Sequence, residues 1–372
     1  MIERRIRGER KMNILALNSG SSSFKFGLYR VDVAGVRTLL TESVDSAGHE
    51  DATARVAQAL AQPGIPAPDA IGHRIVHGGP ALRQHCVIDD TVLRQLEAAA
   101  AFAPLHMPAA LAVIRFAQQR FPGLPQVACF DTRFHAGLPD VARVLPIAKA
   151  LQAQGIQRYG FHGLSLESIV RQLGAELPQR VVIAHLGNGA SVTAVKGGRS
   201  IDTSMGLTPT GGLIMGTRSG DLDPGVLLHL MREKQFDAAG LEALVDHGSG
   251  LLGISGVSSD MRRLHEAAAS NPDARLAIEM LCYAVRKQIA AMIAVLAGID
   301  LLVFTGGIGE NDAAVRAAIC GGLSWIGVSL DEARNSSAGN PIHGGASRCS
   351  VQVLASQEDE QIARHAWALV AA

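Results

Sequence analysis

Three short segments of small residues follow apolar runs in this sequence, and charged side chains lie beside each of them. The segments span residues 20–23, 187–190 and 306–309. Consecutive small residues let backbone N–H groups converge on one point without a Cβ atom in the way, and such an arrangement binds phosphate oxygens. Because the third segment stands between a strand and a helix, it also supplies a helix N-terminus, which attracts anions. The segments therefore predict phosphate-binding turns.

The residues beside these turns are of the types that phosphoryl transfer uses. They stand at predicted strand ends or glycine turns: Asn18, Lys25, Arg74, His77, Asp131, His162, Arg218 and Glu358. Cations stabilise the negative charge that spreads over a transferring phosphoryl group, and oxygen atoms bind Mg²⁺. Each residue alone also has a structural interpretation, such as a surface ion pair for Arg74 or a hydrogen-bonded core histidine for His162. Together the set favours phosphoryl transfer.

Two common nucleotide-binding motifs are absent from the sequence. There is no GxxxxGK[ST] motif, which excludes a P-loop enzyme, and no GxGxxG motif opens a helix after a first strand, which argues against a Rossmann dinucleotide site. Three phosphate-sized turns without either motif favour a nucleotide held between two domains.

The elements that must position these residues alternate between strands and helices. We expect strands within residues 13–31, 70–80, 125–135, 178–200, 299–305 and 350–354. We expect helices within residues 45–70, 89–106 and 271–297, after the turn at 306–309, and at the C-terminal end. Asp89 or Asp90 caps the second of these helices, which should stop near Pro104. The pattern is that of an α/β protein.

An internal repeat links two of the glycine turns. Residues 14–26 (ILALNSGSSSFKF) align with residues 182–194 (VIAHLGNGASVTA), and both read as a strand, a small-residue turn and a returning strand. Any single hairpin carries such residues at its turn. Two matched hairpins and a third glycine turn instead favour a duplicated α/β domain, with the two turns facing each other across a cleft.

The overall composition limits the class of protein. A chain of 372 residues with 48% hydrophobic and 18% charged residues can bury a large core and should form two domains, or three. Acidic and basic residues balance at 34 each, so we expect neither a nucleic acid nor a membrane surface as a partner. The five cysteines form no CxxC pair, which argues against a zinc site or a disulfide framework and fits a reducing compartment.

The sequence also predicts a cytoplasmic protein without a membrane span. The first eleven residues are basic but lead into no apolar signal region, and we expect a disordered extension there. The best candidate for a span, residues 289–304, is interrupted by Gly298 and Asp300 and reads as a helix that runs into a buried strand.

The motifs together resemble the acetate kinase family, within the acetate and sugar kinase, Hsc70 and actin superfamily. The matching stretches are NSGSSSFKF, GHRIVHGG, FAPLHMP, FDTRFH, RYGFHGLS, HLGNGASVTAVKGGRSIDTSMGLTP, MGTRSGDLDPG, GVSSDMR, FTGGIGEN and ASQEDEQIA. The resemblance implies two duplicated ribonuclease H-like (actin-like ATPase) domains around a nucleotide cleft. On this basis residues 12–158 with 361–372 form the first domain, on the acetate side, and residues 159–360 form the second, on the nucleotide side. It further implies a homodimer and reversible transfer of the ATP γ-phosphoryl group to acetate with Mg²⁺, or Mn²⁺, giving acetyl phosphate and ADP.

The family's functional residues carry over position by position. The resemblance implies that Asn18 and Glu358 bind the metal, Lys25 a nucleotide phosphate and Arg74 the acetate carboxylate. It implies Asp131 as the catalytic acid and His162 and Arg218 as transition-state stabilisers. The implied ATP-binding residues are His185, Leu186, Gly187, Asn188, Gly189, Asp260, Met261, Arg262, Gly307, Ile308, Gly309, Glu310 and Asn311. The implied walls of the methyl pocket are Val76, Leu105, Phe161 and Pro209.

Several positions depart from the family pattern. Met107 stands where asparagine is usual, Leu166 where histidine is usual, TPTGGL replaces TPLEGL, and Ser356 and Gln357 replace threonine and asparagine. None of these is a residue assigned to the chemistry.

Other functions need other residues. A sugar or glycerol kinase needs an aspartate base and a larger polar pocket, and a butyrate kinase should have HLGGG where this chain has Asn188. A propionate or other short-chain carboxylate kinase of the same family is the main alternative. A non-catalytic nucleotide-binding module would need none of the residues on the acetate side.

Overall fold

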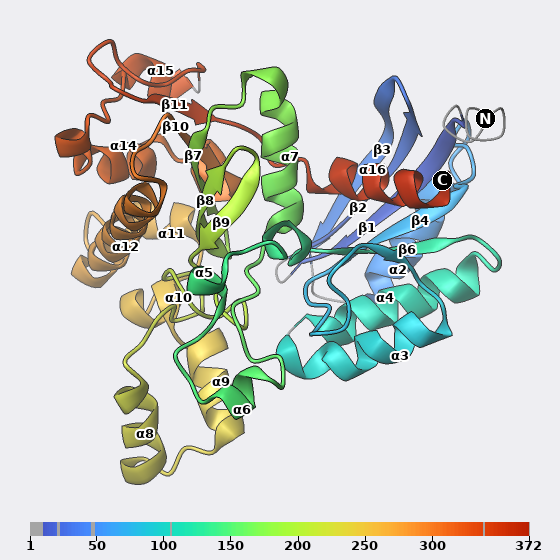
Figure 1. Ribbon diagram of the computed structural model, residues 1–372, viewed down its shortest axis with the longest axis horizontal. Helices are drawn as coiled ribbons and strands as arrows, with labels where there is room; N and C mark the ends of the chain where they lie inside the picture. The colour runs from blue at the N-terminus through green and yellow to red at the C-terminus, as the bar shows by residue number, and fades with distance from the viewer. Residues whose placement is uncertain (1–9, 21–22, 46–48, 105, 338, 372) are drawn as a thin grey trace.

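The computed structural model describes residues 10–20, 23–45, 49–104, 106–337 and 339–371, which form two mixed β-sheets with helices packed on them (Figure 1). The first sheet has the order β3-β2-β1-β4-β6-β5, and the second has the order β11-β10-β7-β8-β9. The strands of the first sheet are β1 (Met12–Ser19), β2 (Ser23–Asp32), β3 (Gly35–Asp45), β4 (Ala70–Ile75), β5 (Cys86–Val87) and β6 (Gln126–Phe130). Those of the second are β7 (Arg180–Leu186), β8 (Ala190–Lys196), β9 (Arg199–Thr203), β10 (Leu301–Thr305) and β11 (Ser350–Val353).

The two sheets share one topology. In the first, β1 pairs antiparallel with β2 and β2 with β3, while β4 pairs parallel with β1 and β6 with β4. In the second, β7, β8, β9, β10 and β11 repeat these relationships in the same order. The short β5 is an addition, antiparallel to β6. This duplicated order is that of ribonuclease H-like, actin-like ATPase domains, so the predicted fold class is confirmed.

Helices connect the strands and cover the sheets. In the first half of the chain they are α2 (His49–Leu60), α3 (Asp90–Ala98), α4 (Met107–Arg120), α5 (Asp140–Arg143), α6 (Lys149–Gln152) and α7 (Gly163–Leu173). In the second half they are α8 (Pro224–Glu233), α9 (Ala238–His247), α10 (Gly250–Ser255), α11 (Met261–Ala267), α12 (Pro272–Leu296), α13 (Gly306–Asn311), α14 (Ala313–Gly321), α15 (Glu332–Ser337) and α16 (Glu358–Val370).

Two helices cross between the sheets. Helix α7 follows β6 of the first sheet, yet its Leu166 and Ile169 belong to an apolar cluster of the second sheet. Helix α16 follows β11 of the second sheet, yet Ile362 packs in an apolar cluster of the first sheet, and Figure 1 shows α16 beside the strands β1 and β4. Gly72 of β4 permits this packing, because a Cβ atom there would lie 2.5 Å from the Ile362 side chain. The exchange ties the two sheets together.

Polar contacts hold α16 and the segment before it against α7. The hydroxyl of Ser168 accepts a hydrogen bond from the backbone N–H of Gln357 at 3.1 Å, and Arg171 donates to the Gln357 side chain at 2.5 Å. Farther along, the His365 Nε2 atom lies 2.5 Å from a carboxylate oxygen of Glu167. These contacts fix the start of α16, where Glu358 stands.

Most of the predicted elements are present, with local differences. Asp89 caps α3 by accepting from Val92 N–H at 2.7 Å, but this helix ends at Ala98, and a 3₁₀ turn continues over Ala99–Phe102 to just before Pro104. The third strand of each sheet, β3 and β9, was not predicted. Helix α12 ends at Leu296 and β10 begins at Leu301, as expected from the interrupted apolar run. Among the described residues, no helix combines the length and the apolar character that a membrane crossing needs.

The expectation of a glycine loop at residues 306–309 is wrong. Helix α13 begins at Gly306 itself, directly after β10. Gly306 has φ of +79°, and a Cβ atom there would lie 2.7 Å from the Leu186 carbonyl oxygen. The Glu310 carboxylate accepts the Gly306 N–H at 2.9 Å and so satisfies the first free amide of the helix.

Candidate active site

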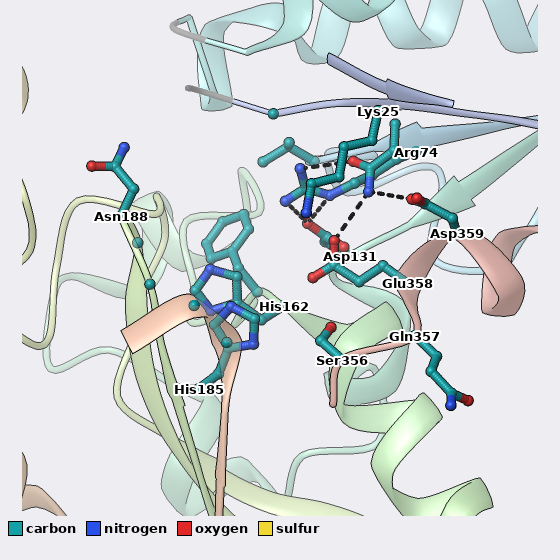
Figure 2. Close-up of a pocket in the computed structure, with 18 of the residues that line it drawn as sticks. Lys25, Arg74, Asp131, His162, His185, Asn188, Ser356, Gln357, Glu358 and Asp359 are labelled. Carbon is teal, nitrogen blue, oxygen red and sulfur yellow. Dashed lines mark hydrogen bonds and ion pairs between the residues drawn. The ribbon is translucent and has the colours of Figure 1, made fainter. Parts of the chain in front are cut away.

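A cavity of about 710 Å³ lies between the two sheets and takes residues from both (Figure 2). In Figure 2, Lys25, Arg74 and Asp131 face His162, His185 and Asn188 across it. The predicted site residues that line this cavity are Asn18, Lys25, Arg74, Val76, Asp131, Phe161, His162, His185, Gly187, Asn188, Gly189, Pro209, Arg218, Gly307, Glu310, Asn311 and Glu358. Residues that lie far apart in the sequence thus meet in one place.

Arg74 and Asp131 form a buried ion pair at the carboxyl ends of parallel strands. The guanidinium donates Nε–H and Nη2–H to Asp131 Oδ2, at 2.9 and 2.6 Å. Burial raises the pKa of Asp131, and Arg74 opposes the shift. Burial alone would lower the pKa of Arg74, but Asp131 and Glu358 raise it, so the guanidinium stays charged. Since Arg74 is charged and bonded twice to one oxygen, we take the pair as ionised near neutral pH.

Asn18 joins this pair to the start of α16. Its Nδ2 donates to Glu358 at 3.1 Å and to Asp359 at 2.7 Å, while its Oδ1 accepts from Arg74 Nη1 at 3.3 Å. Lys25 is the cross-strand partner of Asn18 in the antiparallel β1–β2 hairpin, and the first glycine turn lies between them. This side of the cavity therefore carries both the oxygen atoms of Glu358 and Asp359 and the cations Arg74 and Lys25.

The opposite side carries two stacked imidazoles. The rings of His162 and His185 lie 4.1 Å apart between centroids. His162 Nδ1 lies 2.9 Å from Ser191 Oγ, and His185 Nδ1 lies 2.9 Å from Ser165 Oγ. Burial lowers the pKa of both histidines, so both rings are neutral. His162 also has φ of 61°, an uncommon backbone conformation for a residue with a side chain and one that occurs at functional sites.

A glycine at position 189 leaves room for His162 and Arg218. A Cβ atom on Gly189 would lie 3.1 Å from His162 Nε2 and 3.6 Å from an Arg218 nitrogen. The Arg218 side chain is buried, and its Nη1 donates to the Pro209 carbonyl at 2.8 Å. Among the described residues, Arg218 has no carboxylate in a salt bridge, so the other guanidinium donors remain available.

Three of the four predicted methyl-pocket residues line the cavity beside the two arginines. Val76 and Phe161 are 3% and 1% exposed, and Pro209 adds a rigid wall. Leu105, the fourth, lies outside the described residues.

The predicted nucleotide-binding residues divide between two cavities. Asp260, Met261, Arg262 and Ile308 line a second cavity of about 940 Å³, which shares Gly187, Asn188, Gly307 and Asn311 with the first. Leu186 and Gly309 are buried and line neither of these two cavities. The Glu310 carboxylate is already occupied, because it also accepts the Ser356 N–H at 2.9 Å. Leu186 ends β7, and Gly309 and Glu310 belong to α13, so these residues position the backbone beside the cavities.

Several residues that line the main cavity were not predicted. They are Tyr29, Thr38, His106, Ser356, Gln357, Asp359 and Glu360, while Gly20 and Gly306 belong to the predicted phosphate-binding segments. For Asp359, the signal was its place next to Glu358 in the first turn of α16, which lines the cavity. Ser356 donates to Ser165 at 2.9 Å and so supports the hydroxyl that contacts His185.

Two of the departures from the family pattern are buried away from the cavity, whereas Ser356 and Gln357 line it. Leu166 is fully buried where α7 packs on the second sheet, and Met107 is fully buried at the start of α4. Gln357 points away from the cavity centre in Figure 2, and its side-chain oxygen accepts from Arg171.

Comparison with known proteins places this geometry in a family. A family model described as the acetokinase family matches residues 36–364. Proteins named acetate kinase from Methylocella silvestris and Nitrobacter hamburgensis are each 41% identical to the chain, which is covered over 96% of its length, with 98% and 96% of the relatives covered.

Solved structures agree with this assignment. A propionate kinase from Francisella tularensis has a TM-score of 0.87 at 36% identity, and an acetate kinase from Porphyromonas gingivalis has a TM-score of 0.82 at 34% identity. Both comparisons cover 96% of this chain and 100% of the other. The match extends over nearly the full sequence and both sheets, and the chain therefore belongs to the acetokinase family.

Proposed function

We propose that this chain catalyses the reversible transfer of the γ-phosphoryl group of ATP to acetate, giving acetyl phosphate and ADP. A carboxylate oxygen of acetate forms a bond to the γ-phosphorus, and the bond from that phosphorus to the oxygen bridging the β-phosphate breaks. One observation carries the proposal. A small apolar wall of Val76, Phe161 and Pro209 lies beside Arg74 and Arg218, in a cavity that the glycine segments also line.

The nucleophile needs no general base. A simple carboxylic acid resembles a glutamate side chain, whose reference pKa is about 4.3, so acetate is an anion at neutral pH. This agrees with Asp131, whose Oδ2 is occupied by Arg74. We assign Asp131 the role of orienting Arg74 and stabilising charge, in preference to accepting a proton.

The main barrier is repulsion between two anions, and the cavity supplies cations and N–H donors against it. Arg74 neutralises and orients the acetate carboxylate, since a guanidinium matches the planar shape of that group. Arg218 and the neutral His162 contact the oxygens of the transferring group, where charge develops. Lys25 and the backbone N–H of Gly189 hold the other phosphates, since the Gly187 N–H is donated to the Gly189 carbonyl.

The residues present fit a hard divalent cation such as Mg²⁺, with Mn²⁺ as an alternative. Asn18 and Glu358 offer oxygen atoms to the cavity, and both donors of Arg74 go to Oδ2 of Asp131, which leaves the buried Oδ1 free of Arg74. Oxygen donors alone select hard cations. We assign Asn18 and Glu358 to hold the ion and Asp131 to orient it. When bound, the cation neutralises charge on the nucleotide phosphates.

A propionate or other short-chain carboxylate kinase remains the alternative, because a propionate kinase has this fold at a TM-score of 0.87. The test is trapping of acyl phosphate with hydroxylamine, in reactions of ATP with acetate, propionate and butyrate in turn. Acetate should give the highest kcat/KM. The highest kcat/KM with propionate would establish the alternative. If none of the three acids gave an acyl hydroxamate, the proposal of phosphoryl transfer to a short-chain carboxylate would be refuted.

We further propose the domain boundaries, the oligomeric state and the compartment of the enzyme. The domains are residues 12–158 with 361–372 and residues 159–360, which agrees with the division of the strands between two sheets. The enzyme is a homodimer, and apolar side chains exposed on α8 (Val226, Leu228 and Met231) support an interaction surface. The cytoplasm suits its five free cysteines.

A further inference from the structure

His265 and Asp312 form a hydrogen-bonded pair on the wall of the second cavity, and neither residue was assigned a role from the sequence. His265 belongs to α11, and Asp312 stands at the cap position before α14. The His265 Nε2 atom lies 2.7 Å from Asp312 Oδ2, and the other carboxylate oxygen, Oδ1, accepts the Val315 N–H at 2.9 Å. The helix cap therefore fixes the carboxylate, and the carboxylate fixes the imidazole.

With phosphates bound in the main cavity, the second cavity is the space that adjoins them. Gly187 and Gly307 line both cavities, so a nucleotide held there by its phosphates extends from one space into the other. Binding pockets for flat organic groups are mostly apolar, with a few polar side chains that fix the orientation of the ligand. The second cavity has such an apolar wall, made of Met261, Ile308, Ala313 and Ala314. His265 and Asp312 lie in the same cavity lining and are polar groups available to a purine base.

The pair leaves one ring nitrogen of His265 for a ligand. An ionised carboxylate only accepts hydrogen bonds, so in the neutral imidazole the proton stands on Nε2 and the Nδ1 atom carries a lone pair. Within the part of the chain that the structure describes, Nδ1 has no hydrogen-bond partner, and the side chain is 38% exposed. His265 therefore offers the cavity a hydrogen-bond acceptor, and Asp312 is the reason that it is an acceptor and not a donor.

We propose that His265 selects the base of the nucleotide, with Nδ1 accepting a hydrogen bond from the 6-amino group of adenine and Asp312 as its positioning residue. The inference rests on the proposed function, in which ATP is the phosphoryl donor. Adenine carries an N–H donor at the 6-position, whereas guanine and hypoxanthine carry a carbonyl oxygen, which is an acceptor. Two acceptors repel each other, so the pair favours ATP over GTP and ITP.

The test compares kcat/KM for ATP and for ITP, which differs from ATP only at the 6-position and the adjacent N1. His265→Ala removes the acceptor, so the ATP-to-ITP ratio should fall by about 2- to 10-fold, the effect of one net hydrogen bond. Asp312→Asn is the sharper variant. Asparagine caps a helix as well as aspartate does, and with its oxygen on the Val315 N–H its amide nitrogen donates to Nε2. The ring proton then moves to Nδ1, which becomes a donor, so the ratio should fall below that of His265→Ala.

Calorimetric affinities for ADP and IDP, measured at about pH 8 to favour neutral imidazoles, test the same contrast without the reaction. Glu266→Ala is the matched control, because Glu266 is exposed beside His265 on α11 but does not line the cavity, and its ratio should equal that of wild type. An unchanged ratio in His265→Ala, or a ratio in Asp312→Asn no lower than in His265→Ala, would overturn the inference. A wild-type protein that binds ADP in preference to IDP but forms no acyl hydroxamate would instead overturn the proposed function alone.

Discussion

Arg74 directs two donors to a single oxygen of Asp131, with Nε and Nη2 at 2.9 and 2.6 Å from Oδ2, and makes no hydrogen bond to Oδ1. The pair is formed because β4 and β6 are parallel neighbours: Arg74 stands opposite Cys129, two positions before Asp131. The guanidinium is thus oriented before any substrate enters. A preorganised cation stabilises a transition state without reorganisation at the moment of reaction.

Arg74→Ala and Arg218→Ala should each lower kcat by about 10²- to 10³-fold, as expected for the loss of one electrostatic donor. Their effects on stability should differ. Arg74→Ala leaves the Asp131 carboxylate, 1% exposed, without its partner, which costs about 3–5 kcal/mol of unfolding free energy. Arg218→Ala leaves only the Pro209 carbonyl and a sulfur contact unpaired, so its cost should be smaller.

Urea unfolding and acyl hydroxamate kinetics of the same preparations check this contrast. The double variant Arg74→Ala with Asp131→Ala should recover stability without recovering activity, since it removes the unpaired charge. Near-normal kcat in a folded Arg218→Ala protein would remove that residue from the mechanism. Equal destabilisation by both single variants would show that the buried ion pair is not what distinguishes them.

The enzyme should be inactive in EDTA and recover on addition of Mg²⁺ or Mn²⁺. Glu358→Ala should raise the metal concentration needed for half-maximal activity at least about tenfold, because it removes an oxygen ligand of a hard cation. Glu360→Ala is the matched control: this acid is in the same helical turn, but its carboxylate is bonded to Arg171 and Arg364, at 3.1 and 2.9 Å. An identical metal titration for wild type and Glu358→Ala, or an equal shift in Glu360→Ala, would refute the assignment.

The contact between α7 and α16 should make stability depend on acid pH. Burial would raise the pKa of Glu167, but its contacts with His365 and His85 lower it to about 2, from an ordinary value of 4.5. A carboxyl whose pKa is depressed in the folded state stabilises the protein above its unfolded pKa, and this contribution is lost as pH falls from about 4.5 toward 2. The shift corresponds to at most about 3 kcal/mol at neutral pH.

Glu167→Gln should therefore be less stable than wild type at pH 7, and the difference should shrink between pH 4.5 and 3. Urea midpoints at a series of pH values measure it, with wild type and variant compared at each pH so that other titrating groups cancel. Asp140→Asn is a suitable control, because its carboxylate is exposed and pairs only with Arg143 among the described residues. A stability difference that is constant with pH would argue against the role of the Glu167 charge.

Residues at strand ends could be predicted from the sequence, because strand pairing alone brings them together. Asn18 and Lys25 meet across one hairpin, and Arg74 and Asp131 end adjacent parallel strands. The repeat between residues 14–26 and 182–194 likewise predicted the duplication that the strand orders of the two sheets show.

Residues placed by long-range packing could not be predicted in this way. The position of Asp359 depends on how α16 returns to the first sheet, a result of apolar contacts such as that between Ile362 and Gly72. The Glu310 carboxylate accepts the Gly306 N–H because helix α13 begins at Gly306, where the sequence predicted an open loop. His106 stands in the matching stretch FAPLHMP, but the sequence assigned it no role, and its place in the cavity follows only from the fold.

The acyl pocket yields the last prediction. Val76 and Phe161 are buried walls beside Arg74, and Pro209 is rigid, so the slot should fit one methyl group closely. One methylene changes binding in an apolar pocket by about 1–3 kcal/mol, so kcat/KM should fall stepwise from acetate through propionate to butyrate. Val76→Ala should widen the slot and raise the propionate-to-acetate ratio of kcat/KM by about tenfold. Val127→Ala is the matched control, because Val127 is equally buried in β6 but does not line the cavity, and its ratio should equal that of wild type. A wild-type preference for propionate, or an unchanged ratio in Val76→Ala, would show that these walls do not set the selectivity.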